Sequence, residues 1–309
     1  MLQSNTRRCP CLLAIALLLV AYVGAQTPAQ SLPQEYGQSL TIKIWDNTTA
    51  PHSSGITLPE SRTKTGAFLK NVSEAVLYLF PANSEYATGQ GVILCPGGAY
   101  ESLAITYEGI DIARWLAARG ITAAVLKYRM PNGHPEVPRE DLEQALRILT
   151  GKVEGADGYA LPTDRVGVMG CSAGGHLAAT ISTLSEVRPA FAVLLYPVIS
   201  GEEGVRHRIS FDRLLGRNRT AEDTAPYWLE RRVDEHTPPT LLLLSDDDDL
   251  VPATNSVRYY QALKEHGIRA SMHIYPTGGH GWGFKESFAY HAQWTAALLD
   301  WLQTLPSDR

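Results

Sequence analysis

Short apolar segments alternate with helical patterns along most of this 309-residue chain, and this alternation restricts the fold more than any other feature. Each apolar segment ends at turn residues, as where Gly91–Cys95 runs into Pro96-Gly97-Gly98. The segment Thr240–Ser245 contains four consecutive leucines. Uninterrupted apolar runs are typical of parallel strands that are buried on both faces. The alternation therefore predicts the α/β class, a mostly parallel twisted sheet with helices on both faces.

Hydrophobic spacing and the positions of Gly and Pro set the boundaries of the predicted elements. In the segment 139–150, for example, Leu142, Ala145, Leu146 and Leu149 fall on one face of a helix. Helices are predicted at 111–119, 139–150, 174–183, 257–265 and 288–302, and strands at 75–80, 91–95, 121–128, 165–169, 191–196, 240–245 and 270–275.

The N-terminus has the pattern of a secretory signal peptide at residues 1–25. Arg7 and Arg8 precede an apolar stretch from Cys11 to Val23, and small residues lead to a cleavage position after Ala25. The stretch is short for a membrane span, which needs about 20 apolar residues. The sequence therefore predicts export to the periplasm or the medium, with no stable membrane anchor once the signal peptide is removed.

Residues 26–40 are rich in Gln, Pro and Ser and are predicted to form a flexible lead-in. Residues 41–309 are predicted to form one domain, since a hydrophobic content of 44% is enough for a single large core. Within it, the segment 201–239 is longer and more polar than the other connections. Its length fits either a small cap over the functional site or an ordinary surface excursion.

Composition narrows the range of partners. The net charge is −5, which does not favour nucleic acid as a partner. The histidines lack the spacing of metal ligands, so neither a metal nor another cofactor is predicted. Cleavage after Ala25 leaves Cys95 and Cys171, which lie at predicted strand ends and are expected to be buried, with a bridge between them left open.

The segment Gly170-Cys171-Ser172-Ala173-Gly174 fits the pattern G-x-S-x-G. It follows a predicted strand and opens a predicted helix, which is the setting of a nucleophile elbow. The tight turn exposes the serine hydroxyl at the carboxyl end of the sheet. Ser172 is therefore the predicted nucleophile.

A serine hydroxyl needs a base to accept its proton, and in this kind of fold the acid and then the histidine follow the serine along the chain. His280 lies in a glycine-rich loop directly after the last predicted strand and is the predicted base. The acid is expected just after the strand 240–245, where Asp246-Asp247-Asp248-Asp249 begins. The residues alone leave the choice among these four aspartates open.

Acyl transfer also needs backbone N–H groups that face the developing oxyanion. One donor is expected at Ala173, directly after the nucleophile. The second is expected in the loop Pro96-Gly97-Gly98-Ala99-Tyr100, which follows an early strand. The aromatic residues Tyr100 and Trp282, and also Trp228, lie near the expected site and either border it or pack in the core.

Together these residues resemble a known family, the bacterial α/β-hydrolases of the acetyl-esterase and acetylxylan-esterase type, which are relatives of hormone-sensitive-lipase-like esterases. The resemblance extends from about Ile42 to Leu302 and includes segments for which no catalytic role is inferred. It rests on Cys95–Tyr100, Tyr107-Glu108-Gly109, Leu126-Lys127-Tyr128-Arg129, Gly170–His176, Ser245–Pro252 with Asn255-Ser256, and Gly278–Trp282.

The resemblance implies roles for particular residues. The family's acid lies three positions before a Val-Pro pair, which here selects Asp248, with Asp247 as the second choice. Position by position, the oxyanion donors of the loop fall on Gly98 and Ala99. The implied substrate is an acetyl ester on a plant-type carbohydrate, such as an acetylated xylo-oligosaccharide. Tyr100 and Trp282, and also Trp228, are then candidates for stacking on its sugar rings, with core packing as the equal alternative.

The predicted function is therefore that of a serine carboxylic-ester hydrolase whose substrate is a small-molecule or oligosaccharide ester. One alternative is a serine peptidase of the prolyl-oligopeptidase type, which shares this order of elements but usually carries a large additional N-terminal domain. Another is a non-enzymatic binding protein on the same fold, although such proteins typically lose the serine or the histidine.

Overall fold

A computed structural model describes residues 35–45, 50–153, 160–161 and 165–305. The predicted signal peptide and most of the lead-in lie outside these residues. The prediction of a flexible lead-in is wrong for residues 35–40, since Tyr36 is buried and its ring packs edge-on against Tyr78 at 5.2 Å. In the described ranges, no helix has the length and apolar character needed to cross a membrane.

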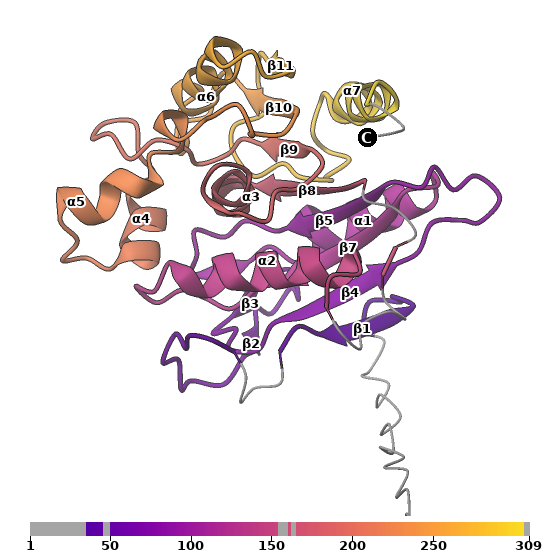
Figure 1. The fold of residues 1–309 in the computed structure, drawn as a ribbon, viewed down its shortest axis with the longest axis horizontal. Coiled ribbons are helices and arrows are strands. Elements are labelled where there is room, and N and C mark those ends of the chain that lie inside the picture. Colours follow the sequence, from indigo (N-terminus) through magenta and orange to yellow (C-terminus); the bar gives the residue numbers. More distant parts are fainter. Residues whose placement is uncertain (1–34, 46–49, 154–159, 162–164, 306–309) are drawn as a thin grey trace, which may run out of the picture. The chain divides into compact units, whose positions relative to one another are not determined.

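An eight-stranded sheet forms the centre of the fold (Figure 1). Its order is β1-β4-β7-β5-β8-β9-β10-β11, and the pairs from β7 to β11 are all parallel, whereas β4 pairs antiparallel with β1 and β7. The predicted, mostly parallel sheet is thus confirmed. Its strands are β1 (Leu40–Lys43), β4 (Val76–Phe80), β5 (Gly91–Cys95), β7 (Thr122–Lys127), β8 (Val166–Cys171), β9 (Ala192–Leu195), β10 (Thr240–Ser245) and β11 (Ala270–Tyr275), while β2 (Ser61–Arg62), β3 (Leu69–Lys70) and β6 (Ser102–Leu103) form a small antiparallel sheet.

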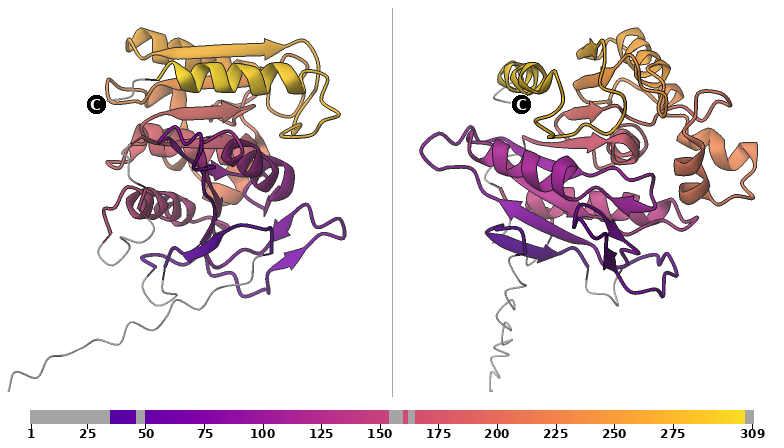
Figure 2. Two further views of the ribbon diagram at one scale, coloured as in Figure 1. Left: turned by 90° about the vertical axis from the view of Figure 1, so that its right-hand side faces the viewer. Right: turned by 180° about the vertical axis from the view of Figure 1, so that it is seen from behind.

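Helices cover both faces of the large sheet. Figures 1 and 2 show α2 and α3 on one face and α1 and α7 on the other. Contact between Trp115 on α1 and Trp294 on α7, with ring centroids 6.3 Å apart, agrees with this arrangement. The helices are η1 (Thr106–Ile110, a π-helix), α1 (Asp111–Ala117), α2 (Glu136–Leu149), α3 (Ser172–Leu184), α4 (Arg208–Leu215), α5 (Ala221–Thr224), the 3₁₀ turns η2 (Ala225–Tyr227) and η3 (Leu229–Arg231), α6 (Thr254–Glu265) and α7 (His291–Gln303).

The helix boundaries differ from the predictions mainly at the N-termini. Helix α2 begins at Glu136 rather than Arg139, with Pro138 in its first turn. Proline is tolerated there because the first amide groups of a helix have no intrahelical acceptor. Helix α3 begins at Ser172, two residues before the predicted start.

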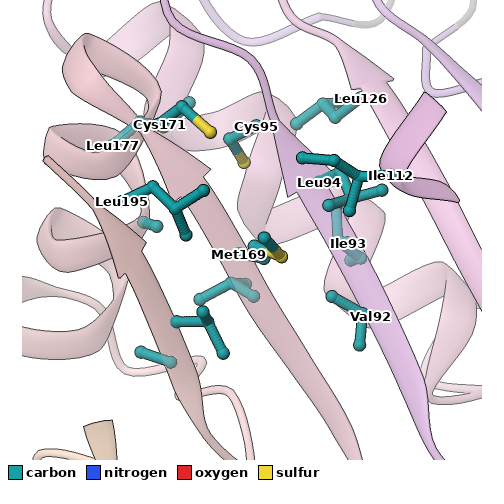
Figure 3. Close-up of a cluster of buried hydrophobic side chains, with 14 of the residues drawn as sticks. Val92, Ile93, Leu94, Cys95, Ile112, Leu126, Met169, Cys171, Leu177 and Leu195 are labelled. Carbon is teal, nitrogen blue, oxygen red and sulfur yellow. The ribbon is translucent and has the colours of Figure 1, made fainter. Parts of the chain in front are cut away.

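Side chains from the central strands make the core. Figure 3 shows Ile93 and Leu94 of β5 beside Met169 of β8, and all three are buried. Cys95 and Cys171 end these two strands as buried free thiols, which confirms their expected burial and leaves them unbridged. The core therefore extends to the strand ends from which the functional loops emerge.

Replacing Leu94 with alanine should lower the free energy of unfolding by about 2–5 kcal/mol, because the side chain is fully buried and its removal leaves a cavity. Urea denaturation would measure the change. Leu58, which is 65% exposed, provides the control, and Leu58→Ala should change the free energy by less than about 0.5 kcal/mol. Equal losses in the two variants would contradict the described core.

Candidate active site

The candidate active site lies where parallel strands end. Strands β5, β8, β10 and β11 run parallel, so their carboxyl ends meet at the same edge of the sheet. The loop of Gly98 follows β5, Ser172 follows β8, Asp248 follows β10, and His280 follows β11. The sheet thus brings together segments that are far apart in the sequence.

Ser172 occupies a strained turn between β8 and α3. Its φ is +53°, in the left-handed region that non-glycine residues rarely adopt. The flanking glycines are needed because the chain approaches other backbone closely. A Cβ on Gly170 would lie 2.2 Å from the carbonyl oxygen of Gly174, and a Cβ on Gly174 would lie 2.0 Å from that of Cys95. The G-x-S-x-G pattern therefore has a steric reason in this fold.

A chain of hydrogen bonds connects Ser172, His280 and Asp248. His280 Nε2 lies 2.8 Å from Ser172 Oγ, and His280 Nδ1 lies 2.6 Å from Asp248 Oδ2. Because a carboxylate accepts hydrogen bonds, Nδ1 carries the proton and Nε2 is left to accept from the serine hydroxyl. The backbone N–H groups of Leu250 and Val251 donate to the other carboxylate oxygen of Asp248, at 3.0 and 2.9 Å, and so fix its orientation.

Asp247 lies next to Asp248 but holds the backbone of the loop that carries His280. Its carboxylate accepts hydrogen bonds from the backbone N–H groups of Gly278 at 3.2 Å and Gly279 at 2.8 Å. It therefore anchors the segment that precedes His280, whereas Asp248 contacts the imidazole itself. Asp246 and Asp249 are exposed and lie outside this chain of contacts.

The loop after β5 carries the expected oxyanion donors. Gly98 and Ala99 both have positive φ, at 132° and 58°. A Cβ on Gly97 would lie 2.9 Å from the Cβ of Ser172, so the loop passes directly beside Ser172. In the described part of the chain, the N–H groups of Gly98, Ala99 and Ala173 donate no hydrogen bond to another residue. These three amides are available to a developing negative charge.

Two protein families match parts of the chain. The prolyl oligopeptidase family matches residues 154–307, which include Ser172, Asp248 and His280. The family described as BD-FAE matches residues 69–194, which include the loop of Gly98 and Ala99.

Individual relatives are more specific. An acetylxylan esterase of Xylanibacter ruminicola is 39% identical over 231 residues, covering 73% of this chain and 48% of the relative. An endo-1,4-beta-xylanase B of Butyrivibrio fibrisolvens is 30% identical over 207 residues, covering 62% of this chain and 32% of the relative. The crystal structure of an acetyl ester-xyloside bifunctional hydrolase from Caldicellulosiruptor lactoaceticus superposes with a TM-score of 0.71 at 31% identity, covering 86% of this chain and 96% of that one. The chain belongs to the α/β-hydrolases of the acetyl-esterase and acetylxylan-esterase type.

Two of the three candidate sugar-stacking residues of this α/β-hydrolase, Trp282 and Tyr100, are buried, whereas Trp228 is partly buried and has the guanidinium of Arg231 3.8 Å from its ring centroid. Trp282 is 3% exposed, stacks in parallel on Phe288 with ring centroids 4.3 Å apart, and donates its indole N–H to Ser245 Oγ at 3.0 Å. Tyr100 is 2% exposed, and its hydroxyl bonds to the ring of His176. Neither ring offers a free face to a sugar, because the neighbouring aromatic and polar groups cover it. Burial favours the alternative of core packing, which anchors the loops beside the site.

His176 holds Tyr100, at the end of the loop that follows β5. Its Nε2 faces the carbonyl oxygen of Tyr227 at 3.3 Å, so Nε2 is the donor and Nδ1 accepts from the hydroxyl of Tyr100 at 3.0 Å. Burial lowers the pKa of His176 to about 4. The ring is therefore neutral in the folded protein at neutral pH.

Acidification should destabilise the protein through His176. Between pH 6.5 and about 4 the unfolded chain binds a proton at this residue and the folded chain does not, so the free energy of unfolding falls as pH falls. The contribution is on the order of 3 kcal/mol. Urea denaturation across this range should show a shallower pH dependence for His176→Asn than for the wild type. Equal slopes would contradict the buried neutral ring.

Other residues lie near the site for which the sequence predicted no catalytic role. Glu108 and Tyr196 are buried, and Tyr196 places its ring 4.9 Å from that of His280. His207, in the segment 201–239, is partly buried. Its pKa is lowered, mainly by burial and also by the charge of His280, while the nearby Asp248 acts in the opposite direction. That segment therefore contributes a side chain close to the site, and its role as a cap stays a prediction. Across the described residues, no group of three or more His, Cys, Asp or Glu side chains is arranged to hold a metal ion.

Proposed function

We propose that the chain is a serine carboxylic-ester hydrolase in which Ser172 is the nucleophile, His280 the base and Asp248 the acid. The observation that carries this proposal is the continuous hydrogen-bonded path from Ser172 Oγ to Asp248 Oδ2 through one imidazole. A serine hydroxyl is a poor nucleophile without such a base. A binding protein on the same fold would have no use for this arrangement at a strained turn.

The reaction follows from the geometry. Ser172 Oγ attacks the ester carbonyl while His280 Nε2 takes its proton, and the imidazolium is stabilised by Asp248. The oxyanion of the tetrahedral intermediate accepts hydrogen bonds from the N–H of Ala173 and from that of Gly98 or Ala99. The intermediate collapses to an acyl-enzyme as His280 returns the proton to the leaving alcohol. His280 then removes a proton from water, which attacks the acyl group, and returns this proton to Ser172 Oγ as the bond from Oγ to the acyl carbon breaks and the acid is released.

The proposed substrate is an acetyl ester on a xylan-type carbohydrate. The support comes from the names of relatives, an acetylxylan esterase and an acetyl ester-xyloside hydrolase. The chain spans only 48% of the length of the acetylxylan esterase. The substrate of that relative is therefore a proposal for this chain and not a finding.

Acetate release from acetylated xylo-oligosaccharides, beside hydrolysis of 4-nitrophenyl acetate, tests this proposal. We expect activity on both substrates. Activity on the small ester alone would support ester hydrolysis but contradict an acetylated carbohydrate as the substrate.

The match of residues 154–307 to the prolyl oligopeptidase family favours a serine peptidase as the second candidate. Cleavage of a proline-containing peptide, without release of acetate, would support that candidate instead.

We propose also that the protein is exported. The basic N-terminal residues, the following apolar stretch and the small residues before Gln26 support a cleaved signal peptide. N-terminal sequencing of the protein from the periplasm or medium of the expressing cells should begin at Gln26. Recovery of the intact N-terminus from the cytoplasm alone would contradict export.

A further inference from the structure

Glu108 is a buried carboxylate next to the candidate active site. It lies in the π-helix η1, directly before α1, and is only 3% exposed. Such π-helical turns frequently occur at functional sites. Here Glu108 lies between two loops that are far apart in the sequence, the loop of Gly97 and the loop that carries His280.

The two carboxylate oxygens of Glu108 have different partners. Oε2 accepts the backbone N–H of Gly97 at 2.7 Å, directly before the proposed oxyanion donors. Oε1 accepts the hydroxyl of Tyr196 at 2.9 Å. The hydroxyl oxygen of Tyr196 in turn accepts the backbone N–H of Gly283 at 2.9 Å, in the loop that carries His280. One carboxylate thus connects the oxyanion loop with the histidine loop.

Both loops also pack tightly against η1. A Cβ on Gly97 would lie 2.7 Å from Glu108 Oε2, and a Cβ on Gly283 would lie 3.0 Å from Glu108 Cγ. The backbone N–H of Phe284 donates to the carbonyl oxygen of Tyr107 at 2.7 Å. The loops therefore have little freedom to move relative to Glu108.

Stability alone gives a poor reason for a carboxylate at this position. Among the described residues Glu108 forms no ion pair within 4.0 Å. Burial raises its pKa, although the hydrogen bonds from Tyr196 and Gly97 and the more distant charges of His280 and Lys285 lower it. Burying an unpaired charge costs free energy that an apolar side chain would not. Buried ionisable groups of this kind concentrate at functional sites.

We propose that Glu108 is a positioning residue, which holds the oxyanion loop and the histidine loop in the relative arrangement needed for acyl transfer. This inference rests on the proposed esterase function. Glu108 acts through Gly97 and Tyr196 rather than on the substrate. Its removal therefore weakens interactions made in the transition state more than those made with the bound ester, and kcat falls while KM is maintained.

Steady-state kinetics with 4-nitrophenyl acetate test the proposal in Glu108→Gln, Tyr196→Phe and the double variant. The glutamine amide offers one acceptor where the carboxylate offers two, so one of the two hydrogen bonds is lost. We expect Glu108→Gln to lower kcat by about 10- to 100-fold, below the loss of about 10²- to 10³-fold typical of a deleted oxyanion donor. Tyr196→Phe keeps the ring against His280 and should lower kcat by about 3- to 10-fold. Because both residues act through the same hydrogen bonds, the double variant should lose much less than the product of the single losses.

Glu101→Gln is the matched control, since Glu101 is a nearby glutamate that is exposed and faces Arg213. It should retain kcat and KM within about twofold. Retention of wild-type kcat in Glu108→Gln, multiplicative losses in the double variant, or a rise in KM that accounts for the loss would overturn the proposal. If Glu108→Gln does not fold, unchanged kcat in Tyr196→Phe overturns it instead. A wild-type protein inactive on every ester would remove the proposed function itself.

Discussion

Ser172→Ala is expected to lower kcat for 4-nitrophenyl acetate by about 10⁴- to 10⁶-fold, the loss typical when a hydrolase loses its nucleophile. Alanine has no hydroxyl to attack the ester, and water at the same position lacks the alignment that the turn gives Ser172 Oγ. The remaining rate would come from the oxyanion amides and from His280 acting on water. Stopped assays of 4-nitrophenol release at saturating substrate would measure the effect.

A second serine on the same helix supplies the control for that loss. Ser182 is fully buried in α3 and donates its hydroxyl to the carbonyl oxygen of Ala178 at 2.9 Å, with no contact to His280. Ser182→Ala should retain kcat within about twofold, and both variants should remain folded by circular dichroism. More than about 1% of wild-type activity in pure Ser172→Ala would mean that another group is the nucleophile.

Asp248→Asn is expected to lower kcat by about 10³- to 10⁴-fold with little change in the fold. The amide of asparagine can donate to His280 Nδ1, which moves the ring proton to Nε2. Nε2 then no longer accepts from Ser172 Oγ, although the distances are nearly unchanged. The pH-independent value of kcat for 4-nitrophenyl acetate would show this loss.

Asp247→Asn is the matched comparison, because the two aspartates are neighbours with different partners. The asparagine oxygen still accepts one of the two glycine amides, so the loop before His280 is retained in part. We expect a loss of less than about 10-fold, in line with the loss of one hydrogen bond at an exposed site. A large loss in Asp247→Asn together with a small one in Asp248→Asn would assign the acid to Asp247.

Much of this site could be predicted from the sequence because each residue follows a parallel strand. The strands 91–95, 240–245 and 270–275 agree with the structure to the residue, the first two as buried apolar runs and the third as a partly buried strand of alternating character. The loops that follow them were therefore placed at the correct edge of the sheet. The choice of Asp248 among four consecutive aspartates needed the family resemblance, because spacing alone does not say which carboxylate faces the imidazole.

Other features could not be predicted from the sequence. Glu108 lies in a segment that supports the family resemblance, but its partner Gly97 and the partner of Tyr196, Gly283, are bonded through backbone N–H groups, which almost any residue type can supply. The burial of Trp282 depends on contacts made only in the folded protein. Phe288 stacks on its ring, and Ser245 accepts its indole N–H. The short strands β2, β3 and β6 have two residues each, too few for any periodicity to be visible.

Covalent labelling with a fluorophosphonate probe, followed by peptide mass spectrometry, tests the proposed nucleophile most directly. An activated serine oxygen displaces fluoride from phosphorus, so the adduct identifies the attacking residue independently of the natural substrate. We expect one adduct per chain, on Ser172, that is absent in Ser172→Ala and forms far more slowly in His280→Ala. An adduct on a different residue, or no adduct on protein that hydrolyses 4-nitrophenyl acetate, would contradict the assignment of Ser172 as the nucleophile.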